Sequence, residues 1–392
     1  MKNNTTLLID GNYFIYSRLY VLPRPKSIVG LPDEKFMSSD KDKGMLMRKL
    51  SIDFASELRK LKTITNRIVF TLDHRSWRKD FYPDSGYKAN RTQDEKIDWN
   101  GISEVISEFV KLLQKQGVIV NKMAGSEGDD LIFAWAMNLN SIGENCIIWS
   151  GDQDLIQLVN YNNSTGAFTL WYDNTRSKMA TYPGFNKWLN TNESSSNSVD
   201  IFSKDTGFYL VDKYKKDFNE FVVKSKLNLS EVYCDEFALE KILTGDKSDN
   251  IKSVIEKPSK KGDKMFRFSP KKAKNVLTNF KKRHGRFSTI YLFDNDYKNE
   301  IVKLVAREMK VVGKNDEILK NLELNTQLVL LHVNTIPEAI QKNMFEQIKD
   351  DTISESAIEF SNLMDKDKFL KDTKYIKQNT NDLPKGGVGG LF

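Results

Sequence analysis

The chain has 392 residues, of which 39% are hydrophobic, 11% aromatic and 29% charged, a composition typical of a globular protein with about two or three domains. No apolar run approaches the roughly 20 residues of a membrane span, the N-terminus has no signal-peptide pattern, and two cysteines and three histidines leave little for a disulfide framework or a zinc site. We therefore expect a cytoplasmic protein without a membrane partner, and its net charge of +7 favours a polyanionic partner.

The first half of the chain alternates short apolar runs with segments of helical spacing. The apolar runs are β-branched or apolar and bounded by turn residues, which predicts buried strands at 5–10, 67–73, 117–123 and 145–152. Helical spacing predicts helices at 44–61, 100–116 and 127–139, and a short one at 153–159. This alternation predicts an α/β fold with a mostly parallel central sheet and helices on both faces, in which ligands bind at the carboxyl ends of the strands.

Acidic residues stand at the ends of these predicted strands. They are Asp10 and Asp73 at the ends of the first two, Glu127, Asp129 and Asp130 after the third, and Asp152 and Asp154 after the fourth. A single acid at a strand end is usually a turn residue, and the acids of GSEGDDL also suit a helix N-terminus capped by Ser126. Seven carboxylates at one sheet edge repel one another unless cations lie between them, and clusters of oxygen ligands suit Mg²⁺ or Mn²⁺. We therefore expect a carboxylate site for divalent ions.

Residues 257–286, here called the basic limb, contain twelve Lys or Arg and one acid, so they carry a charge of +11 while the rest of the chain carries −4. One interpretation is a solvated lysine-rich loop, and the other is a surface for a phosphate backbone. Together with the carboxylate site, the second interpretation indicates two-metal phosphodiester hydrolysis. A phosphatase of the haloacid-dehalogenase type would also begin with an Asp after the first strand, but it requires a second Asp where this chain has Asn12.

Five motifs in a fixed order carry a resemblance to a known family. They are LIDGN (8–12), TLDHRSWRKDFYPDSGYKANR (71–91), GSEGDDL (125–131), SGDQDLIQL (150–158) and TGDKSDNIKSV (244–254). In these motifs the chain resembles the structure-specific 5′ nucleases, the family of flap endonucleases and 5′ to 3′ exonucleases, and within it the phage RNase H branch most closely. The resemblance covers about residues 1–180 and 233–345.

The resemblance implies a role for each matching residue. It makes Asp129 a bridging, catalytic ligand within a metal-binding set of Asp10, Asp73, Glu127, Asp129, Asp130, Asp152, Asp154, Asp246 and Asp249. Lys88 and Arg91, at the foot of a helical arch at about 75–115, would be catalytic and hold the scissile phosphate. Tyr87 would stack on a terminal base or else pack inside the protein, and Arg78 would contact a phosphate or else pair with a nearby acid.

The resemblance also implies a division into domains. A PIN-like catalytic core would occupy 1–180, an insertion 181–232, a helical helix-hairpin DNA-binding region 233–345, and a C-terminal region with a flexible tail 346–392. The usual glycine-rich hairpin is replaced here by a longer lysine-rich one, which argues against the family's potassium site and favours non-specific phosphate contacts by Lys271, Lys272 and Lys274. The tail ends in GGLF, which is similar to short clamp-docking peptides.

The function implied is that of a metal-dependent 5′ to 3′ exonuclease and flap endonuclease of RNase H type, using two Mg²⁺ ions or Mn²⁺ in their place. It would remove RNA primers and 5′ flaps in phage-type DNA replication, as a monomer in the host cytoplasm if phage-encoded. The implied partners are DNA and RNA–DNA duplexes with 5′ ends or flaps, a single-stranded-DNA-binding protein and a sliding clamp. The alternative is a catalytically inactive nucleic-acid-binding module on the same fold, which would be free to lose the acids that this chain keeps.

Overall fold

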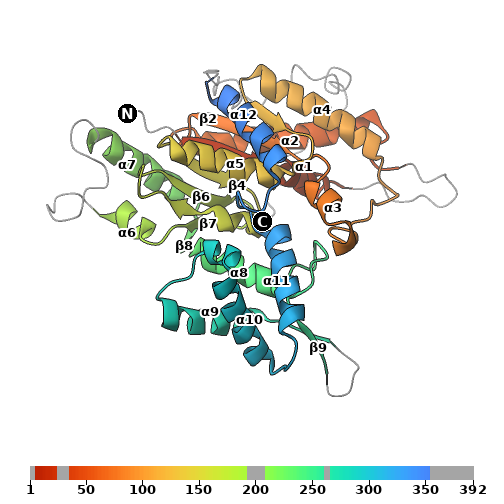
Figure 1. Cartoon of the computed structure of the whole chain (residues 1–392). Coiled ribbons are helices and arrows are strands. Elements are labelled where there is room, and N and C mark those ends of the chain that lie inside the picture. The colour runs from red at the N-terminus through yellow and green to blue at the C-terminus, as the bar shows by residue number, and fades with distance from the viewer. Residues whose placement is uncertain (1–4, 24–34, 192–207, 260–264, 354–392) are drawn as a thin grey trace. The chain divides into compact units, whose positions relative to one another are not determined.

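The computed structural model describes residues 5–23, 35–191, 208–259 and 265–353 (Figure 1). By its internal contacts the chain divides into two compact units. The first unit consists of residues 1–12, 64–92 and 121–355, and the second of residues 13–63, 93–120 and 356–392. The serine-rich stretch of the insertion, residues 260–264 of the basic limb and the C-terminal tail lie outside the described residues.

The described residues form an eight-stranded sheet in the order β3-β2-β1-β4-β6-β7-β8, with β5 paired to β6. The pairs β1–β2, β1–β4, β4–β6 and β7–β8 are parallel, whereas β5–β6 and β6–β7 are antiparallel, so the prediction of a mostly parallel sheet is confirmed. The strands are β1 (Thr5–Asp10), β2 (Arg67–Leu72), β3 (Ile119–Lys122), β4 (Asn145–Trp149), β5 (Asn160–Tyr161), β6 (Phe168–Asp173), β7 (Lys178–Thr181) and β8 (Asn228–Glu231).

Helices cover both faces of this sheet. On one face, Asn140 of α5 (Gly128–Ser141) accepts a hydrogen bond from Thr169 of β6, and α12 (Glu338–Ile353) packs on α5 (Figure 1). On the other face, the ring of Phe221 in α7 (Phe208–Lys224) lies 5.5 Å from that of Tyr172. Thr169 and Tyr172 are three positions apart on one strand, and since side chains alternate along a strand, they point to opposite faces. The predicted helices on both faces are confirmed.

The insertion at 181–232 is partly built into this sheet. Its described residues form α6 (Phe185–Asn190), α7 and β8, and β8 pairs in parallel with β7. Phe185, Phe218 and Phe221 are fully buried. The insertion therefore adds an edge strand and an aromatic layer to the first unit.

Residues 234–329 form a helical region around its own apolar core, which includes Ile242, Val254, Phe280 and Ile301. Its helices are α8 (Cys234–Thr244), α9 (Pro270–His284), η3 (Thr289–Phe293), α10 (Asn295–Met309) and α11 (Asn315–Val329), and β9 (Glu256–Pro258) pairs with β10 (Met265–Arg267). Ser269 caps α9, and Pro270 occupies its first turn, where a missing N–H costs nothing. The predicted helical C-terminal region is confirmed.

The second unit contains most of α1 (Gly11–Leu19), α2 (Asp40–Leu61) and α4 (Trp99–Lys115). The rings of Phe14, Phe54 and Phe109 meet in its core at centroid distances of 5.7 to 6.0 Å. The two short helices α3 (Trp77–Phe81) and η1 (Pro83–Ser85) belong to the first unit. The boundary between the units therefore falls within the stretch at 75–115 predicted to be an arch. No described helix is long and apolar enough to cross a membrane.

Candidate active site

Four carboxylates gather where the parallel strands of the first unit end. Asp10, at the end of β1, accepts a hydrogen bond of 2.8 Å from Ser150 Oγ, just after β4. Asp73, just after β2, accepts one of 2.6 Å from the amide of Gly128. Burial raises the pKa of Asp129 well above its usual range, and the charges of Asp152, Asp10 and Asp73 raise it further. The acids predicted at the strand ends therefore lie close enough to act on one another.

This cluster fits a divalent cation by its chemistry. Its donors are carboxylate oxygens, which Mg²⁺ and Mn²⁺ prefer, and the charges of Asp152, Asp10 and Asp73 all act on Asp129. As the side chains stand, no three acids, histidines or cysteines in the described residues converge into a group that could hold an ion. Such spreading is expected of carboxylates that repel one another.

A lysine ammonium joins two further acids beside this cluster. Lys241 Nζ of α8 lies 2.6 Å from Asp154 Oδ1 and 2.8 Å from Asp246 Oδ2. Burial and the charge of Asp152 raise the pKa of Asp154 to about 6, against the lowering effect of Lys241. Burial would also raise the pKa of Asp246, but hydrogen bonds from Lys241 and Ser248 lower it to about 2. Sequence reasoning missed Lys241, although it stands on the helical run that leads into the TGDKSDN motif.

Gly245 places Asp246 in this position. It ends α8 with a φ of +67°, and a Cβ atom there would lie 2.4 Å from the carbonyl oxygen of Lys252. Only glycine adopts this backbone without strain and leaves room for the returning chain. The glycine of the TGDKSDN motif is therefore required by the close approach of two backbone segments.

Glu127 is a second centre of charge in the site. Its Oε2 accepts hydrogen bonds of 2.8 Å from Ser76 Oγ, 2.9 Å from Arg78 Nη1 and 3.0 Å from the hydroxyl of Tyr87, and its Oε1 is paired with Lys88 Nζ. Burial would raise the pKa of Glu127, but Lys88 and Arg78 lower it to about 2. Glu127 is also the N-cap residue of α5, which corrects the expectation that Ser126 caps this helix.

Lys88 lies on a strained turn fixed by the loop that carries Asp249. Its backbone has a φ of +55°, a conformation that is uncommon outside glycine, and its amide donates a 2.8 Å hydrogen bond to the carbonyl oxygen of Asp249. Asn90 and Asn250 each add a side-chain hydrogen bond between the two loops. Arg91 is ion-paired with Asp249 and remains half-exposed. The structure thus brings Lys88, Arg91 and Asp249 together.

Burial alone would lower the pKa of Lys88, but Tyr87, Glu127 and Asp249 raise it above its usual range. Its ammonium is therefore protonated, and the charge of Asp129 also acts on it. A buried cation with a fixed backbone is suited to stabilise negative charge on a phosphate.

Arg78 and Asp130 form a buried ion pair. The Arg78 side chain is 3% exposed and that of Asp130 is fully buried. Two hydrogen bonds of 2.9 and 3.1 Å join them, and Trp77 Nε1 and the amide of Glu127 also donate to Asp130 at 3.1 Å. With four accepted hydrogen bonds and no exposed surface, Asp130 holds Arg78 rather than a metal ion. For Arg78 the ion-pair alternative is the correct one, and the phosphate contact is not.

Tyr87 packs inside the protein, which is the second of the two roles expected for it. Its ring is buried in the core of the helical region, 7% exposed, and its hydroxyl donates to Glu127. In this position it cannot stack on a base, which corrects the prediction of nucleic-acid contact. The resemblance that implied stacking rests on the YKANR motif, and this motif does not reveal which way the ring points.

The three lysines of the basic limb that were expected to contact phosphates lie on α9. Lys271 and Lys274 are exposed, whereas Lys272 is half-buried with its Nζ 2.8 Å from Met309 Sδ. Exposure of the first two leaves them available to solvent or to a ligand, while Lys272 has a contact within the helical region.

Comparison with known proteins matches residues 5–185 to the family model of the 5′-3′ exonuclease N-terminal resolvase-like domain. The 5′-3′ exonuclease of Buchnera aphidicola subsp. Acyrthosiphon pisum is 27% identical over 162 residues, which are 41% of this chain and 51% of that protein. DNA polymerase I of Mycobacterium leprae is 28% identical over 157 residues, 39% of this chain and 15% of that polymerase. The chain thus spans about half the length of the Buchnera exonuclease.

Among solved structures, a flap endonuclease of bacteriophage T5 with DNA and metal ions aligns over 89% of this chain and 99% of its own, at 14% identity and a TM-score of 0.47. The T5 5′-exonuclease with divalent metal ions (zinc) aligns over 88% of this chain and 99% of its own, at 15% identity and a TM-score of 0.44.

Proposed function

Because residues 5–185 match the family model of the 5′-3′ exonuclease N-terminal domain, we propose that this chain is a metal-dependent 5′ nuclease. It would cleave phosphodiesters from 5′ ends and at 5′ flaps, including those of RNA primers paired to DNA. The observation that carries the proposal is the gathering of Asp10, Asp73, Asp129 and Asp152 at one sheet edge, beside a protonated Lys88. The similarity to the Buchnera 5′-3′ exonuclease supports the same class of reaction.

Two sets of carboxylates would hold the metal ions, for which we propose Mg²⁺, with Mn²⁺ as a substitute. Asp10, Asp73, Asp129 and Asp152 form the first set, and Asp154, Asp246 and Asp249 the second. Glu127 joins the first set through Oε1, since Oε2 already accepts three hydrogen bonds. When bound, such ions activate water and offset charge on the leaving oxygen.

The chain's own cations would position the substrate. Lys88, fixed by its turn and by Glu127, would bind the scissile phosphate and stabilise its developing charge. Arg91 is more exposed and would reach an adjacent phosphate. Lys241 would balance the charges of Asp154 and Asp246. Asp130 and Arg78 would act as positioning residues that fix the start of α5.

Duplex binding is proposed for the helical region, through non-specific phosphate contacts from exposed lysines of α9. Such contacts carry no sequence information, which suits an enzyme that recognises the form of its substrate. We further propose action in DNA replication, with a sliding clamp and a single-stranded-DNA-binding protein as partners. The preference between RNA and DNA would be measured by comparing the cleavage rates of an RNA flap and a DNA flap of matched sequence.

The test uses purified protein and a 5′-labelled flap oligonucleotide, with Mg²⁺ or with a chelator. Cleavage is expected only with Mg²⁺. Asp152→Asn should lower kcat by about 100-fold or more while flap binding in chelator persists, and Asp316→Asn, an exposed acid on α11, should cleave like wild type. Binding of the flap by the wild type without cleavage under any divalent ion would instead establish the inactive nucleic-acid-binding module.

A further inference from the structure

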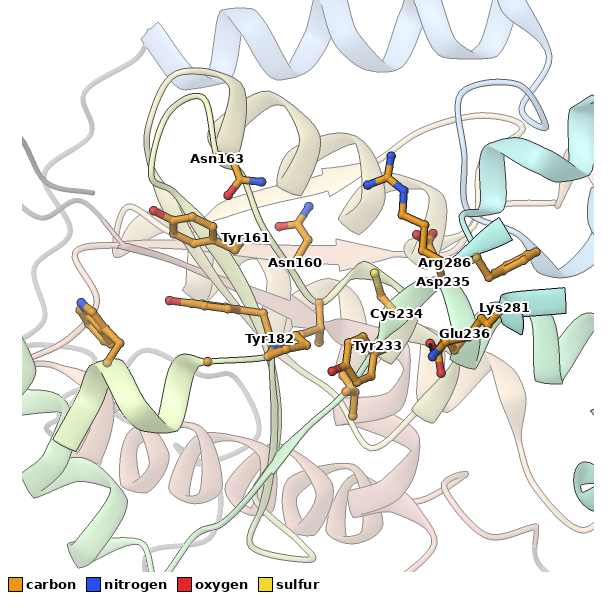
Figure 2. A pocket seen from close by; sticks show the side chains of 17 residues that line it. Asn160, Tyr161, Asn163, Tyr182, Tyr233, Cys234, Asp235, Glu236, Lys281 and Arg286 are labelled. Carbon is orange, nitrogen blue, oxygen red and sulfur yellow. Dashed lines mark hydrogen bonds and ion pairs between the residues drawn. The ribbon is translucent and has the colours of Figure 1, made fainter. Parts of the chain in front are cut away.

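The first unit contains a hollow of about 740 Å³ apart from the carboxylate cluster (Figure 2). It lies between β5, the turn from β7 to α6, the start of α8 and the end of α9. Five aromatic residues contribute to its wall: Tyr161, Tyr182, Trp188, Tyr233 and Phe287. Tyr182 and Trp188 come from the insertion at 181–232, whose role no sequence motif indicates.

The aromatic groups offer ring faces to a ligand. Figure 2 shows Tyr161 and Tyr182 together on one side of the hollow, and their ring centroids are 5.0 Å apart. Tyr233 lies between them and the cations, and it is 62% exposed. Lys281 Nζ lies 5.6 Å from the centre of the Tyr233 ring. An exposed ring beside a cation is a suitable surface for a stacked planar group that carries negative charge.

Acids and cations both line the hollow. Glu236 is paired with Lys281 at 2.6 Å, and Asp235 accepts hydrogen bonds from the backbone and hydroxyl of Thr289. Arg286 is exposed. The two acids and two cations of this wall balance, so the net positive charge comes from the continuation of the hollow along α9, whose wall adds Lys274 and Lys282 against Glu240.

A second hollow of about 580 Å³ continues from the first along α9, because the two share Glu236 and Lys281 in their walls. Its wall also contains Lys274, Thr278 and Lys282, which lie on one face of α9 since residues three and four positions apart are neighbours on a helix. A groove thus leads from the lysines of α9 to the aromatic hollow. The opposite end of α8 carries Lys241 of the carboxylate site, about 10 Å along the helix from Cys234.

We propose that this groove binds a single-stranded segment of the nucleic-acid substrate. An unpaired base would stack on the exposed ring of Tyr233, while the phosphates follow Arg286, Lys282 and Lys274. A single strand is required because only an unstacked base presents a free face to an aromatic wall. The proposal rests on the proposed nuclease function and assigns the insertion a role in holding substrate.

The test measures fluorescence anisotropy of a labelled oligothymidylate of about ten nucleotides in chelator, where cleavage does not occur. Tyr233→Ala should weaken binding by about 5- to 150-fold, the range expected for one stacked base, while Tyr233→Phe retains it. Arg286→Ala should also weaken binding, whereas Arg283→Ala, its matched control, should not, because Arg283 is paired with Glu300 outside the hollow. A short blunt duplex should bind all four variants as it binds wild type.

A 5-iodouracil oligonucleotide should crosslink to Tyr233 or Tyr182 on irradiation, and flap cleavage with Mg²⁺ is measured in parallel. If wild type cleaves flaps but Tyr233→Ala binds the single strand unchanged, the inference is wrong and the nuclease function stands. If no flap is cleaved but single-strand affinity falls in Tyr233→Ala, the nuclease function fails and the groove remains. If Tyr233→Ala binds the oligonucleotide like wild type but no longer binds a peptide of residues 386–392, the groove is a peptide site and the proposal is overturned.

Discussion

Replacing Arg78 with methionine should destabilise the protein strongly. Arg78 donates to Glu127, twice to Asp130 and, through Nε at 3.0 Å, to the carbonyl oxygen of Leu328. Glu127 would keep three other donors, but fully buried Asp130 would keep only Trp77 and the amide of Glu127. Removing one partner of a buried ion pair costs about 3–5 kcal/mol. Because both acids keep other donors, we expect the free energy of unfolding of Arg78→Met to fall by about 3 kcal/mol, the lower end of this range.

The assay is urea denaturation followed by circular dichroism. Arg75→Met is the matched control, because its side chain is 72% exposed and its ion pair with Asp80 should contribute only about 0–1 kcal/mol. In a double-mutant cycle, Arg78→Met with Asp130→Asn should cost less than the sum of the single changes, since the orphaned charge is gone. If Arg78→Met is as stable as wild type and its DNA binding depends less steeply on salt, this reasoning is refuted. Arg78 would then be a phosphate contact after all.

Three further outcomes are expected. The α9 lysines to be replaced by glutamine are Lys271, Lys272 and Lys274. The slope of log affinity for duplex against log salt should become shallower by roughly 0.9 for each phosphate that is no longer neutralised. An unaltered slope would mean that these lysines form a solvated surface. Tyr87→Phe should lower the free energy of unfolding by about 1.5 kcal/mol without changing DNA affinity, because it removes a buried hydrogen bond to a charged group; equal stability would contradict this. Deleting 386–392 should spare cleavage of a short flap but abolish stimulation by a clamp, unless the tail has no docking role.

The sequence predicted those parts of the fold that periodicity encodes. The predicted strands at 5–10, 67–73 and 145–152 correspond to β1, β2 and β4 within a few residues, because each is an apolar run buried on both faces. Strands β6, β7 and β8 were not predicted. They follow the last recognised motif of the catalytic core, and β8 is a short edge strand, NLSE, without an alternating or apolar pattern.

The candidate site was predicted to the extent that topology decides it. Parallel strands deliver the residues that follow them to one edge, so Asp10, Asp73 and Asp152 could be placed together without knowing any side-chain direction. The orientation of Arg78 and Tyr87 depends instead on which neighbour completes a buried charge network. Such pairing is a tertiary property, and no local pattern distinguishes an arginine that faces solvent from one that faces Asp130.

The crowding of acids at the start of α5 follows from helix geometry. Successive residues on a helix point about 100° apart, so neighbours in the sequence enter different surroundings. Asp129 faces Asp10 and Asp152, where its pKa rises. Asp130 turns into the protein, pairs with Arg78 and accepts the amide of Glu127, as a capping residue does. Capping and ion binding are therefore not competing explanations of the motif: one acid organises the helix start while its neighbour faces the carboxylate cluster.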